Sequence, residues 1–545
     1  MIVNTRAQLG GAPAWQQWPF TLGVAAVLTV IALRLALALR ARSQRRSVLS
    51  KWRQSAEGKA APRIVGFFHP YCNAGGGGER VLWTAIACMQ RDCGSDTLFV
   101  VYTGDVGPGK ATKEQVLAKA EARFGIRISP ASVAFVALRH RWLVEDSTWP
   151  RLTLLGQSIG SVLLAIEGLF AHGGVVPDVW IDTMGYAFAY PVVKYLCQVP
   201  VGSYTHYPTI STDMLERVRN RRAGHTNSSV VAKSAFLSFL KLAYYRVFAA
   251  AYSASLRCAD VLWVNSSWTK AHVASLLGEK PASSQASSVG SGTGIRLLYP
   301  PCDTRHLATF PIENADRHGP NGEIVILSLA QFRPEKEHPT QLRAFAKLLA
   351  SPSVAQARGT IKRDQLRLVL AGSVRGQTDA QRVEALRDLA KELGIEQQVD
   401  FRVNESYEVI CDLMRNASVG LHTMIDEHFG ITMVEFQAAG VIPLAHASAG
   451  PLNDIVVPCN DAANSTGFLA PPPSSASNPK LDLAEEFAQQ LEHILALPVE
   501  RQDEIRRNAR QNAVDKFGAE VFERGWMEGW SDLERRLPDR ARKIE

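Results

Sequence analysis

The most informative segment of this chain is residues 422–435, which read HTMIDEHFGITMVE. Two carboxylates, Glu427 and Glu435, stand eight positions apart around Gly430, where we expect a helix to begin. The free N–H groups and the positive dipole end of such a helix favour a bound diphosphate. Glu435 would then lie in the first turns, where it can accept hydrogen bonds from ribose hydroxyls, and Glu427 would precede the helix at the level of a sugar. The alternative is an amphipathic helix with two solvated acids.

The composition predicts a large folded protein whose positive charge is confined to one end. The chain has 545 residues, 46% hydrophobic and 21% charged, which is enough for about two to three domains with substantial cores. The net charge is +8, but residues 1–63 contain ten Lys and Arg residues against one acid, Glu57, so this segment carries +9 and the rest −1. We therefore expect no nucleic-acid partner, because the globular part has no basic excess.

A long apolar run near the N-terminus predicts a membrane anchor. Residues 18–39 are apolar except for two threonines and Arg34, which is long enough to cross a bilayer if Arg34 reaches the interface. The basic cluster 40–46 follows the run, and the positive-inside rule places everything after it in the cytoplasm. We thus expect a short lumenal tail over residues 1–17, a transmembrane anchor over 18–40 and a basic juxtamembrane linker over 41–62. A cleaved signal peptide is the alternative, but its charge would lie on the wrong side of the apolar core.

Two series of apolar runs predict two α/β domains with parallel sheets. The first series begins at residue 63 with a strand, a glycine loop and a helix, which is a Rossmann-like opening. The second begins at residue 324. We expect an N-terminal domain over residues 63–310, a C-terminal domain over 311–505 and a C-terminal helix over 506–545, which carries an apolar stripe. The predicted strands are 63–69, 97–102, 133–137, 179–181, 201–204, 261–264, 296–298, 324–328, 366–371, 399–403, 419–421 and 442–445.

Two further features bear on the compartment. The eight cysteines show no C-x-x-C spacing, which is typical of reduced thiols. Residues 236–259 form another apolar stretch, which Lys241 and Arg246 make a poor membrane span. A buried helix and an interfacial helix that touches the bilayer both remain open for this stretch.

A glycine loop follows the first predicted strand and opens a helix. Gly75, Gly76, Gly77 and Gly78 precede Glu79 and Arg80. Without side chains, the backbone N–H groups of such a loop can closely approach a phosphate. A merely mobile turn is the alternative, because a glycine-rich loop alone is a weak signal.

Two cations leave the first strand of the second domain, Arg333 and Lys336. A reaction that expels a diphosphate needs positive charge at the leaving oxygens, and no set of residues with metal-ligand spacing is present in the sequence. We therefore expect Arg333 and Lys336 to supply this charge without a metal ion. The alternative is a solvated charged loop.

Polar residues at predicted strand ends of the first domain complete the candidate site. His206 follows the strand 201–204 and faces the expected cleft. His69 and Asp213 also lie near strand ends, and we regard them as secondary candidates for binding an acceptor. A lone histidine is more often structural, which is the alternative for each of them.

The two glutamates separated by seven residues, the helix end at Gly440 and the residues 448–451 that follow resemble glycosyltransferase family 4. Within that family, four segments resemble the alpha-1,2-mannosyltransferases of asparagine-linked glycosylation, over roughly residues 62 to 535. These segments are 68–78, 205–215, 264–269 and 331–339.

The resemblance implies an α/β fold of GT-B architecture, in which two Rossmann-like domains face a cleft and the last helix crosses back to the N-terminal domain. It implies a retaining transferase that adds the fourth and fifth mannoses from GDP-mannose to the dolichol-diphosphate-linked oligosaccharide on the cytosolic face of the endoplasmic reticulum membrane. Other mannosyltransferases of the pathway are possible partners, and no cofactor is expected. Two alternatives stay open: a related transferase acting on another lipid acceptor, and a non-catalytic scaffold of a glycosylation complex.

The resemblance also implies residue roles. Glu427 would orient the mannose, His206 would hydrogen-bond the donor sugar near its reacting carbon, and Lys336 and Arg333 would hold the diphosphate. Donor binding would involve Glu435, Phe429, Gly430, Ile431, Gly77 and Gly78, and acceptor binding would involve His69, Asp213, Gly75 and Gly76. This chain departs from many relatives at two positions, with Gln331 where they have Arg and Tyr207 where they have an acid.

Overall fold

A computed structural model describes the conformation of most of the chain. The described residues are 18–55, 62–94, 96–210, 214, 219, 235–279, 294–313, 317, 319, 322–355, 362–374, 376–457, 464–472 and 479–537. The tail 1–17 and the candidate Asp213 lie outside them.

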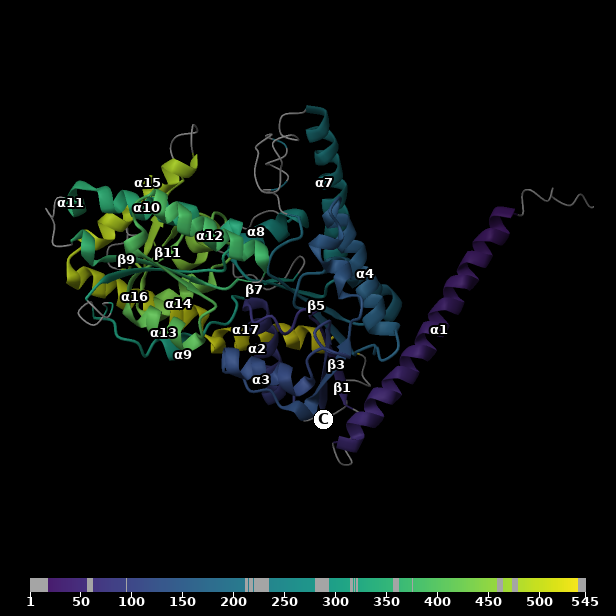
Figure 1. The fold of residues 1–545 in the computed structure, drawn as a ribbon. Helices are drawn as coiled ribbons and strands as arrows, with labels where there is room; N and C mark the ends of the chain where they lie inside the picture. Colours follow the sequence, from purple (N-terminus) through teal and green to yellow (C-terminus); the bar gives the residue numbers. More distant parts are fainter. Residues whose placement is uncertain are drawn as a thin grey trace, which may run out of the picture.

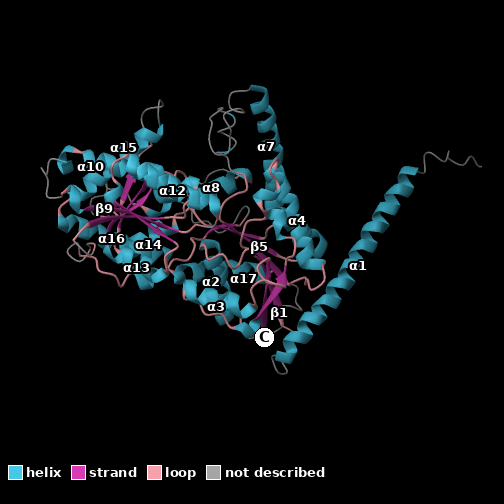
Figure 2. Ribbon diagram, viewed as in Figure 1, coloured by secondary structure: helices cyan, strands magenta, loops and turns pink. Residues whose placement is uncertain are grey.

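Within the described ranges, the strands form two parallel sheets, which Figure 2 shows in magenta with helices on both sides of each. The first sheet has the order β3-β2-β1-β4-β5-β6-β7. Its strands are continuously apolar because both faces are covered, and all seven positions of β2 are buried. The bounds are β1 Arg63–Phe68, β2 Thr97–Thr103, β3 Val133–Ala137, β4 Val179–Asp182, β5 Val201–Thr205, β6 Val261–Val264 and β7 Ile295–Leu297.

The second sheet has the order β10-β9-β8-β11-β12-β13. Its last strand, β13, was not predicted from the sequence. It has only three residues, too few to show a pattern. The bounds are β8 Ile324–Leu329, β9 Leu366–Gly372, β10 Val399–Val403, β11 Ala417–His422, β12 Ile442–His446 and β13 Phe468–Ala470.

Helices cover both faces of each sheet (Figure 1). In the first domain they are α2 Gly77–Asp92, α3 Lys113–Phe124, α4 Thr153–Phe170, α7 Ala235–Leu256 and α8 Ser267–Leu276. In the second they are α10 His338–Ala350, α11 Pro352–Ala355, α12 Gln377–Glu392, α13 Tyr407–Asn416, α14 Ile431–Ala439, α15 Pro479–Ala496 and α16 Val499–Phe517. The short helix α9, Thr304–Leu307, packs on α14 and α16 of the second domain. α4 is long and apolar enough to cross a bilayer, but half of it is buried within the domain, as is typical of a core helix.

The strand order reverses beside the first strand of each sheet, between β1 and β4 and between β8 and β11. In open parallel sheets, ligands bind outside the carboxyl ends of the strands at such a switch point. His69 follows β1, and Thr183 follows β4. In the second domain, Thr423 follows β11, and the loop to Lys336 follows β8. The topology therefore puts the candidate residues of each domain at its switch point.

The C-terminal helices connect the two domains. The backbone N–H of Cys302 donates to the carbonyl of Phe517 at 3.1 Å, where α16 ends. α17, Ala519–Glu534, then packs against α2 and β6 of the first domain, shown in yellow in Figure 1. Trp526 of α17 is fully buried and stacks on Trp263 of β6 with ring centroids 4.5 Å apart. The predicted apolar stripe of the tail is thus part of the first domain's core.

The N-terminal helix is longer than the expected anchor. α1 runs without interruption over Trp18–Ser55, so residues 41–55 of the predicted juxtamembrane linker continue the helix. Residues 41–55 contain no Gly or Pro, and Arg, Gln and Lys are good helix formers. Arg45 donates two hydrogen bonds to the Asp178 carboxylate, at 3.0 and 2.9 Å, and Trp52 is buried in the first domain. The basic segment is therefore a helix docked on the globular part.

Candidate active site

An ion pair joins the two loops at the switch point of the second sheet. Lys336 ends a short 3-10 turn after β8, and Glu427 lies in the loop after β11. The Lys336 Nζ lies 2.5 Å from Glu427 Oε2, and His422 Nε2 lies 3.0 Å from the same oxygen. Both members of the ion pair are largely buried, with side chains 21% and 15% exposed. Lys336 and Glu427 thus form one charged unit.

The surroundings of Glu427 keep it ionised. Burial alone would raise the pKa of this carboxyl, but the Lys336 ammonium and the hydrogen bond to His422 outweigh it and hold the pKa well below its ordinary value. The loop is fixed by its backbone, because the Gly450 N–H donates to the Glu427 carbonyl at 2.9 Å. The ionised Glu427 carboxylate, a hydrogen-bond acceptor, is therefore held in a defined place before α14.

Gly430 turns the chain from this loop into α14. Its φ is +105°, a region that residues with a Cβ rarely adopt. α14 begins at the next residue, Ile431, as predicted from the sequence. The N-terminus of this helix comes directly after the loop that carries Glu427, and its free N–H groups and dipole favour an anion there.

Two neutral histidines, the buried His69 and the partly buried His206, lie across from this loop in the first domain. His69 Nδ1 lies 2.7 Å from the hydroxyl of Thr183, and His206 hydrogen-bonds the backbone of the same residue. Burial, and next the neighbouring His206, lower the pKa of His69 to about 3, and burial chiefly lowers that of His206 to about 4. The Nε2 atoms of both rings are buried without a hydrogen-bond partner among the described residues. They are therefore available to bind hydroxyl groups of a ligand.

The glycine loop brings the two domains into contact. A Cβ on Gly77 would lie 2.6 Å from Cδ1 of Ile431, so the first residue of α14 packs directly on the loop. A Cβ on Gly78 would lie 3.5 Å from His206 Nε2. Gly76 donates its N–H to Glu79 at 2.8 Å, while Gly75 faces Arg123 of α3. The loop therefore places Gly77 and Gly78 against the candidate site, and Gly75 away from it.

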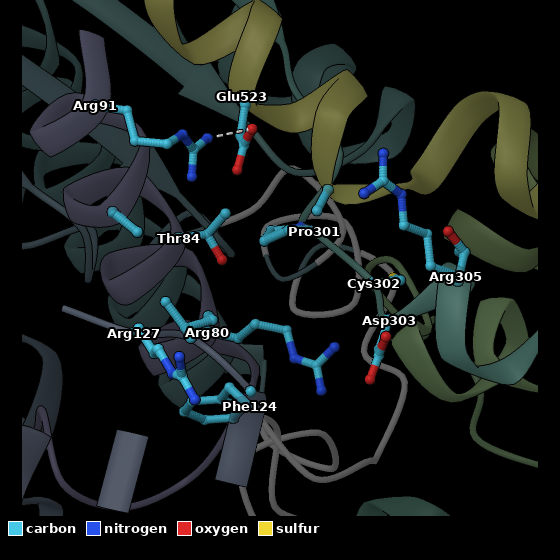
Figure 3. Close-up of a pocket in the computed structure, with 15 residues that line it drawn as sticks. Arg80, Thr84, Arg91, Phe124, Arg127, Pro301, Cys302, Asp303, Arg305 and Glu523 are labelled. Atoms are coloured by element: carbon cyan, nitrogen blue, oxygen red, sulfur yellow. Dashed lines mark ion pairs between the residues drawn. The ribbon is translucent and has the colours of Figure 1, made fainter. Parts of the chain in front are cut away.

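Glu435 lies beside a basic pocket. This pocket has a volume of about 390 Å³ and lies between α2, the end of α3, the segment 301–305 and α17 (Figure 3). Arg80 projects into it toward Asp303, and its guanidinium lies 5.4 Å from the Phe124 ring centroid. Burial raises the pKa of the Glu435 carboxyl, Arg80 lowers it, and Asp303 raises it again. No described side chain hydrogen-bonds this carboxylate, which leaves it open to a ligand.

An aromatic contact that the sequence did not predict connects the domains next to Glu427. Tyr207 of the first domain stacks on His428 of the second, with ring centroids 4.0 Å apart and an interplanar angle of 20°. Trp268 of α8 stacks on both rings, at 5.8 and 5.1 Å. Close by, Asp454 accepts hydrogen bonds from the Ser267 N–H at 3.0 Å and the Tyr299 hydroxyl at 2.9 Å. Tyr207 therefore bridges the two domains beside Glu427.

Like Gly75, the Arg333 guanidinium and the Phe429 side chain do not converge with the other predicted site residues. The Arg333 guanidinium lies 3.9 Å from Glu335 in its own loop and contacts neither Glu427 nor Lys336. The Phe429 side chain is buried in the core between Tyr299 and Phe517, with ring centroids 5.5 Å away from each. Any contact of Phe429 with a ligand must come from its backbone. Within the described part of the chain, no group of three or more His, Cys, Asp or Glu residues is arranged to hold a metal ion.

Comparison with known families and proteins identifies the kind of site this is. The sequence model of the family described as "ALG11 mannosyltransferase N-terminus" matches residues 62–277, and that described as "Glycosyl transferases group 1" matches residues 312–512. The human GDP-Man:Man(3)GlcNAc(2)-PP-Dol alpha-1,2-mannosyltransferase is 44% identical over 460 residues, which cover 84% of this chain and 85% of the human protein. Its counterpart from Xenopus tropicalis is 43% identical over 509 residues, covering 93% and 95%.

Solved structures agree on the fold. The sucrose-phosphate synthase of Thermosynechococcus elongatus has a TM-score of 0.57 at 18% identity, covering 86% of this chain and 99% of its own. The alpha,alpha-trehalose 6-phosphate synthase of Burkholderia multivorans has a TM-score of 0.57 at 13% identity, covering 87% and 98%. These similarities confirm the predicted GT-B architecture, and the sequence relatives show that the chain belongs to the ALG11 mannosyltransferase family of glycosyltransferases.

Proposed function

We propose that this enzyme transfers mannose from GDP-mannose to a dolichol-diphosphate-linked oligosaccharide, forming alpha-1,2 linkages that add its fourth and fifth mannoses. The names of the relatives give this donor, acceptor and linkage. The observation that carries the proposal is the Lys336–Glu427 ion pair in front of α14. It combines a cation for a diphosphate with a carboxylate for sugar hydroxyls at a single point of the cleft.

The donor would lie along the second domain. The diphosphate would meet the α14 N-terminus and Lys336, because both supply positive charge to developing anionic oxygens. The ribose would meet Glu435, whose carboxylate has no described hydrogen-bond donor of its own. The mannose would meet Glu427 on one side and the unpaired His206 Nε2 on the other. In this arrangement the positive charge comes from the protein, and no metal ion is required.

An alpha-linked donor that gives an alpha-linked product requires retention. We favour substitution on one face of the sugar. The bond between mannose C1 and the diphosphate oxygen breaks as the acceptor hydroxyl attacks from the same side, and the hydroxyl proton passes to the departing oxygen. Glu427 is held by Lys336 and His422, so its role here is to orient the mannose rather than to attack C1. The closed contact between Gly77 and Ile431 would exclude water and limit hydrolysis.

The terminal sugar of the acceptor would approach from the first domain. His69 is neutral at physiological pH and would offer its unpaired Nε2 to this sugar, next to the His206 that meets the donor mannose. Neutral imidazoles can exchange hydrogen bonds with sugar hydroxyls without adding charge near C1. α1 would anchor the enzyme in the endoplasmic reticulum membrane with the two domains on the cytosolic side, as the basic residues after its apolar part indicate.

A direct assay tests this function. The purified full-length enzyme is incubated in detergent with GDP-mannose and the trimannosyl lipid acceptor, and the product is analysed by mass spectrometry before and after digestion with an alpha-1,2-specific mannosidase. We expect two added hexoses, both removed by the mannosidase. A product with beta-linked mannose, or no transfer to this acceptor, would contradict the proposal.

A further inference from the structure

Helix α4 presents an apolar stripe to the surface of the first domain. Its opposite face is in the core, where Leu164, Ala165 and Leu169 are fully buried. The exposed side chains recur every three or four residues, so they line one face of the helix. They are Leu152, Leu155, Ile159, Leu163 and Ile166, with exposed fractions of 38 to 59%. Exposed apolar side chains gathered in this way mark an interaction site rather than scattered surface residues.

Helix α7 continues this apolar surface. Phe236, Phe239, Leu240 and Val247 are exposed along it. The helix contains no Asp or Glu, and its only charges are Lys241 and Arg246. In Figure 1, α7, α4 and α1 follow one another on the same side of the molecule. An apolar helix that carries two cations and no acid is complementary to lipids that carry phosphate groups.

A groove separates the start of α4 from α7. It has a volume of about 430 Å³, and its lining includes Leu152, Leu154, Leu240, Tyr244 and Tyr245 together with Lys241. The Lys241 ammonium lies 5.4 Å from the centroid of the Tyr245 ring, and partial burial lowers its pKa. The groove therefore combines an apolar wall with one cation.

The groove lies near the contact between the two domains. Burial, then Tyr244 and then the neighbouring Tyr207 raise the pKa of Tyr245, which lines the groove. Tyr207 in turn stacks on His428, the residue after Glu427. The far end of α4 is bound to α1, where Arg40 and Gln44 donate hydrogen bonds to the Phe170 carbonyl. α4 therefore connects the proposed anchor with the groove.

We propose that the groove between α4 and α7 binds the first isoprene units of the lipid-linked acceptor, with Lys241 facing its diphosphate. The proposal rests on the proposed function, because it concerns the lipid part of the same acceptor. An isoprenoid diphosphate matches both parts of the lining, since its chain is apolar and its head is anionic.

The first test compares two acceptors that carry the same oligosaccharide, one with the dolichyl diphosphate and one with a methyl group in its place. Leu240→Gln should lower the ratio of kcat/KM for the dolichyl acceptor to that for the methyl acceptor by about threefold to tenfold, because one apolar contact is lost. Lys241→Met should lower the same ratio, and Lys241→Arg should restore it. Leu163→Gln is the matched control on the same stripe of α4, outside the groove, and should leave the ratio unchanged. Equal losses on both acceptors, or no change in the ratio, would overturn the proposal.

A second measurement does not depend on turnover. A photoreactive geranylgeranyl diphosphate is crosslinked to the full-length enzyme, and the labelled peptides are identified by mass spectrometry. We expect labels on residues 152–155 or 240–245, reduced in Leu240→Gln and retained in Leu163→Gln. Labels confined to other parts of the chain would overturn the groove even if mannose transfer is confirmed. Labels in the groove without transfer to any acceptor would instead support the groove and contradict the proposed function.

Discussion

The Lys336 ammonium lies 2.5 Å from a carboxylate oxygen of Glu427, so the cation expected to hold the diphosphate and the acid expected to hold the sugar form a single ion pair. Neither residue can be changed without altering the other. The loss of Lys336 leaves Glu427 with His422 alone, and the loss of Glu427 leaves a largely buried ammonium without its partner carboxylate.

Lys336→Ala should remove about 2–4 kcal/mol of transition-state stabilisation, as the loss of one positively charged or hydrogen-bonding group at a developing anion does. Because the pair acts as a unit, the double variant with Glu427→Gln should lose less kcat/KM than the sum of the two single losses. Wild-type transfer should persist in EDTA. Three results would each contradict the role of Lys336 at the diphosphate. They are activity of Lys336→Ala within about twofold of wild type, a double variant whose loss of kcat/KM equals the sum of the single losses, and a strict need for magnesium.

The two histidines should not titrate in the physiological range. Their pKa values, lowered by burial to about 3 for His69 and about 4 for His206, mean that both stay neutral above about pH 5. The pH profile of kcat/KM should therefore show no limb near 6.5 that depends on them. Because the unfolded chain binds these protons more readily, the free energy of unfolding should fall as the pH drops below about 6.5. A kinetic limb near pH 6.5 that disappears in His206→Gln would show that His206 titrates during catalysis.

Tyr207 should hold the domains together around the donor. Tyr207→Ala removes the ring that stacks on His428, a contact of about 0.5–1.5 kcal/mol beyond area burial, so transfer should fall by roughly twofold to tenfold. Hydrolysis of GDP-mannose should rise relative to transfer, because water enters a less closed cleft. Tyr207→Phe keeps the ring and should keep the ratio of hydrolysis to transfer. If Phe and Ala shift this ratio equally, the hydroxyl rather than the stack is responsible.

Arg80 should keep Glu435 ionised. Burial raises the pKa of Glu435 and Arg80 lowers it, so Arg80→Met should raise this pKa further. As the pH falls, Glu435 would gain a proton and lose its ability to accept from ribose hydroxyls, and in the variant this loss should begin at higher pH. Calorimetry of GDP binding between about pH 5 and 8 measures the pH at which the affinity for GDP begins to fall. Arg91→Met is the matched control, because Arg91 lines the same pocket but pairs with Glu523. If the affinity for GDP depends on pH in the same way in wild type and Arg80→Met, Arg80 does not keep Glu435 ionised.

Local sequence signals were sufficient for most of the fold. Continuous apolar runs bounded by glycine and polar residues located the strands of both sheets, since buried parallel strands need such runs. The three residues of β13 were too few to show a pattern. The continuation of α1 to Ser55 was not predicted, because the apolar run that indicates the anchor ends near Leu39. The exposed apolar face of α4 was not predicted, because the segments that pack on its other face, including α1, are distant in sequence.

The candidate site was predictable where a residue's role depends on its own segment. Gly430 and Glu427 follow from the turn into α14, and Lys336 from its loop. The packing of the Phe429 side chain could not be predicted, because its neighbours, Tyr299 and Phe517, come from distant segments. The histidine pair depends on three strands of the first sheet that are distant in sequence, and the stack of Tyr207 on His428 depends on the two domains meeting. No local pattern encodes either arrangement.

The central claim is that Lys336, Glu427, Glu435 and the α14 N-terminus form one site for a sugar nucleotide, divided between its sugar and its nucleoside. Calorimetry of GDP binding, alongside turnover with GDP-mannose, tests it in Glu427→Ala and Glu435→Ala. Glu435→Ala should weaken the binding of GDP, whereas Glu427→Ala should lower kcat and leave GDP affinity nearly unchanged, because GDP lacks the mannose. A larger loss of GDP affinity in Glu427→Ala than in Glu435→Ala would contradict the account.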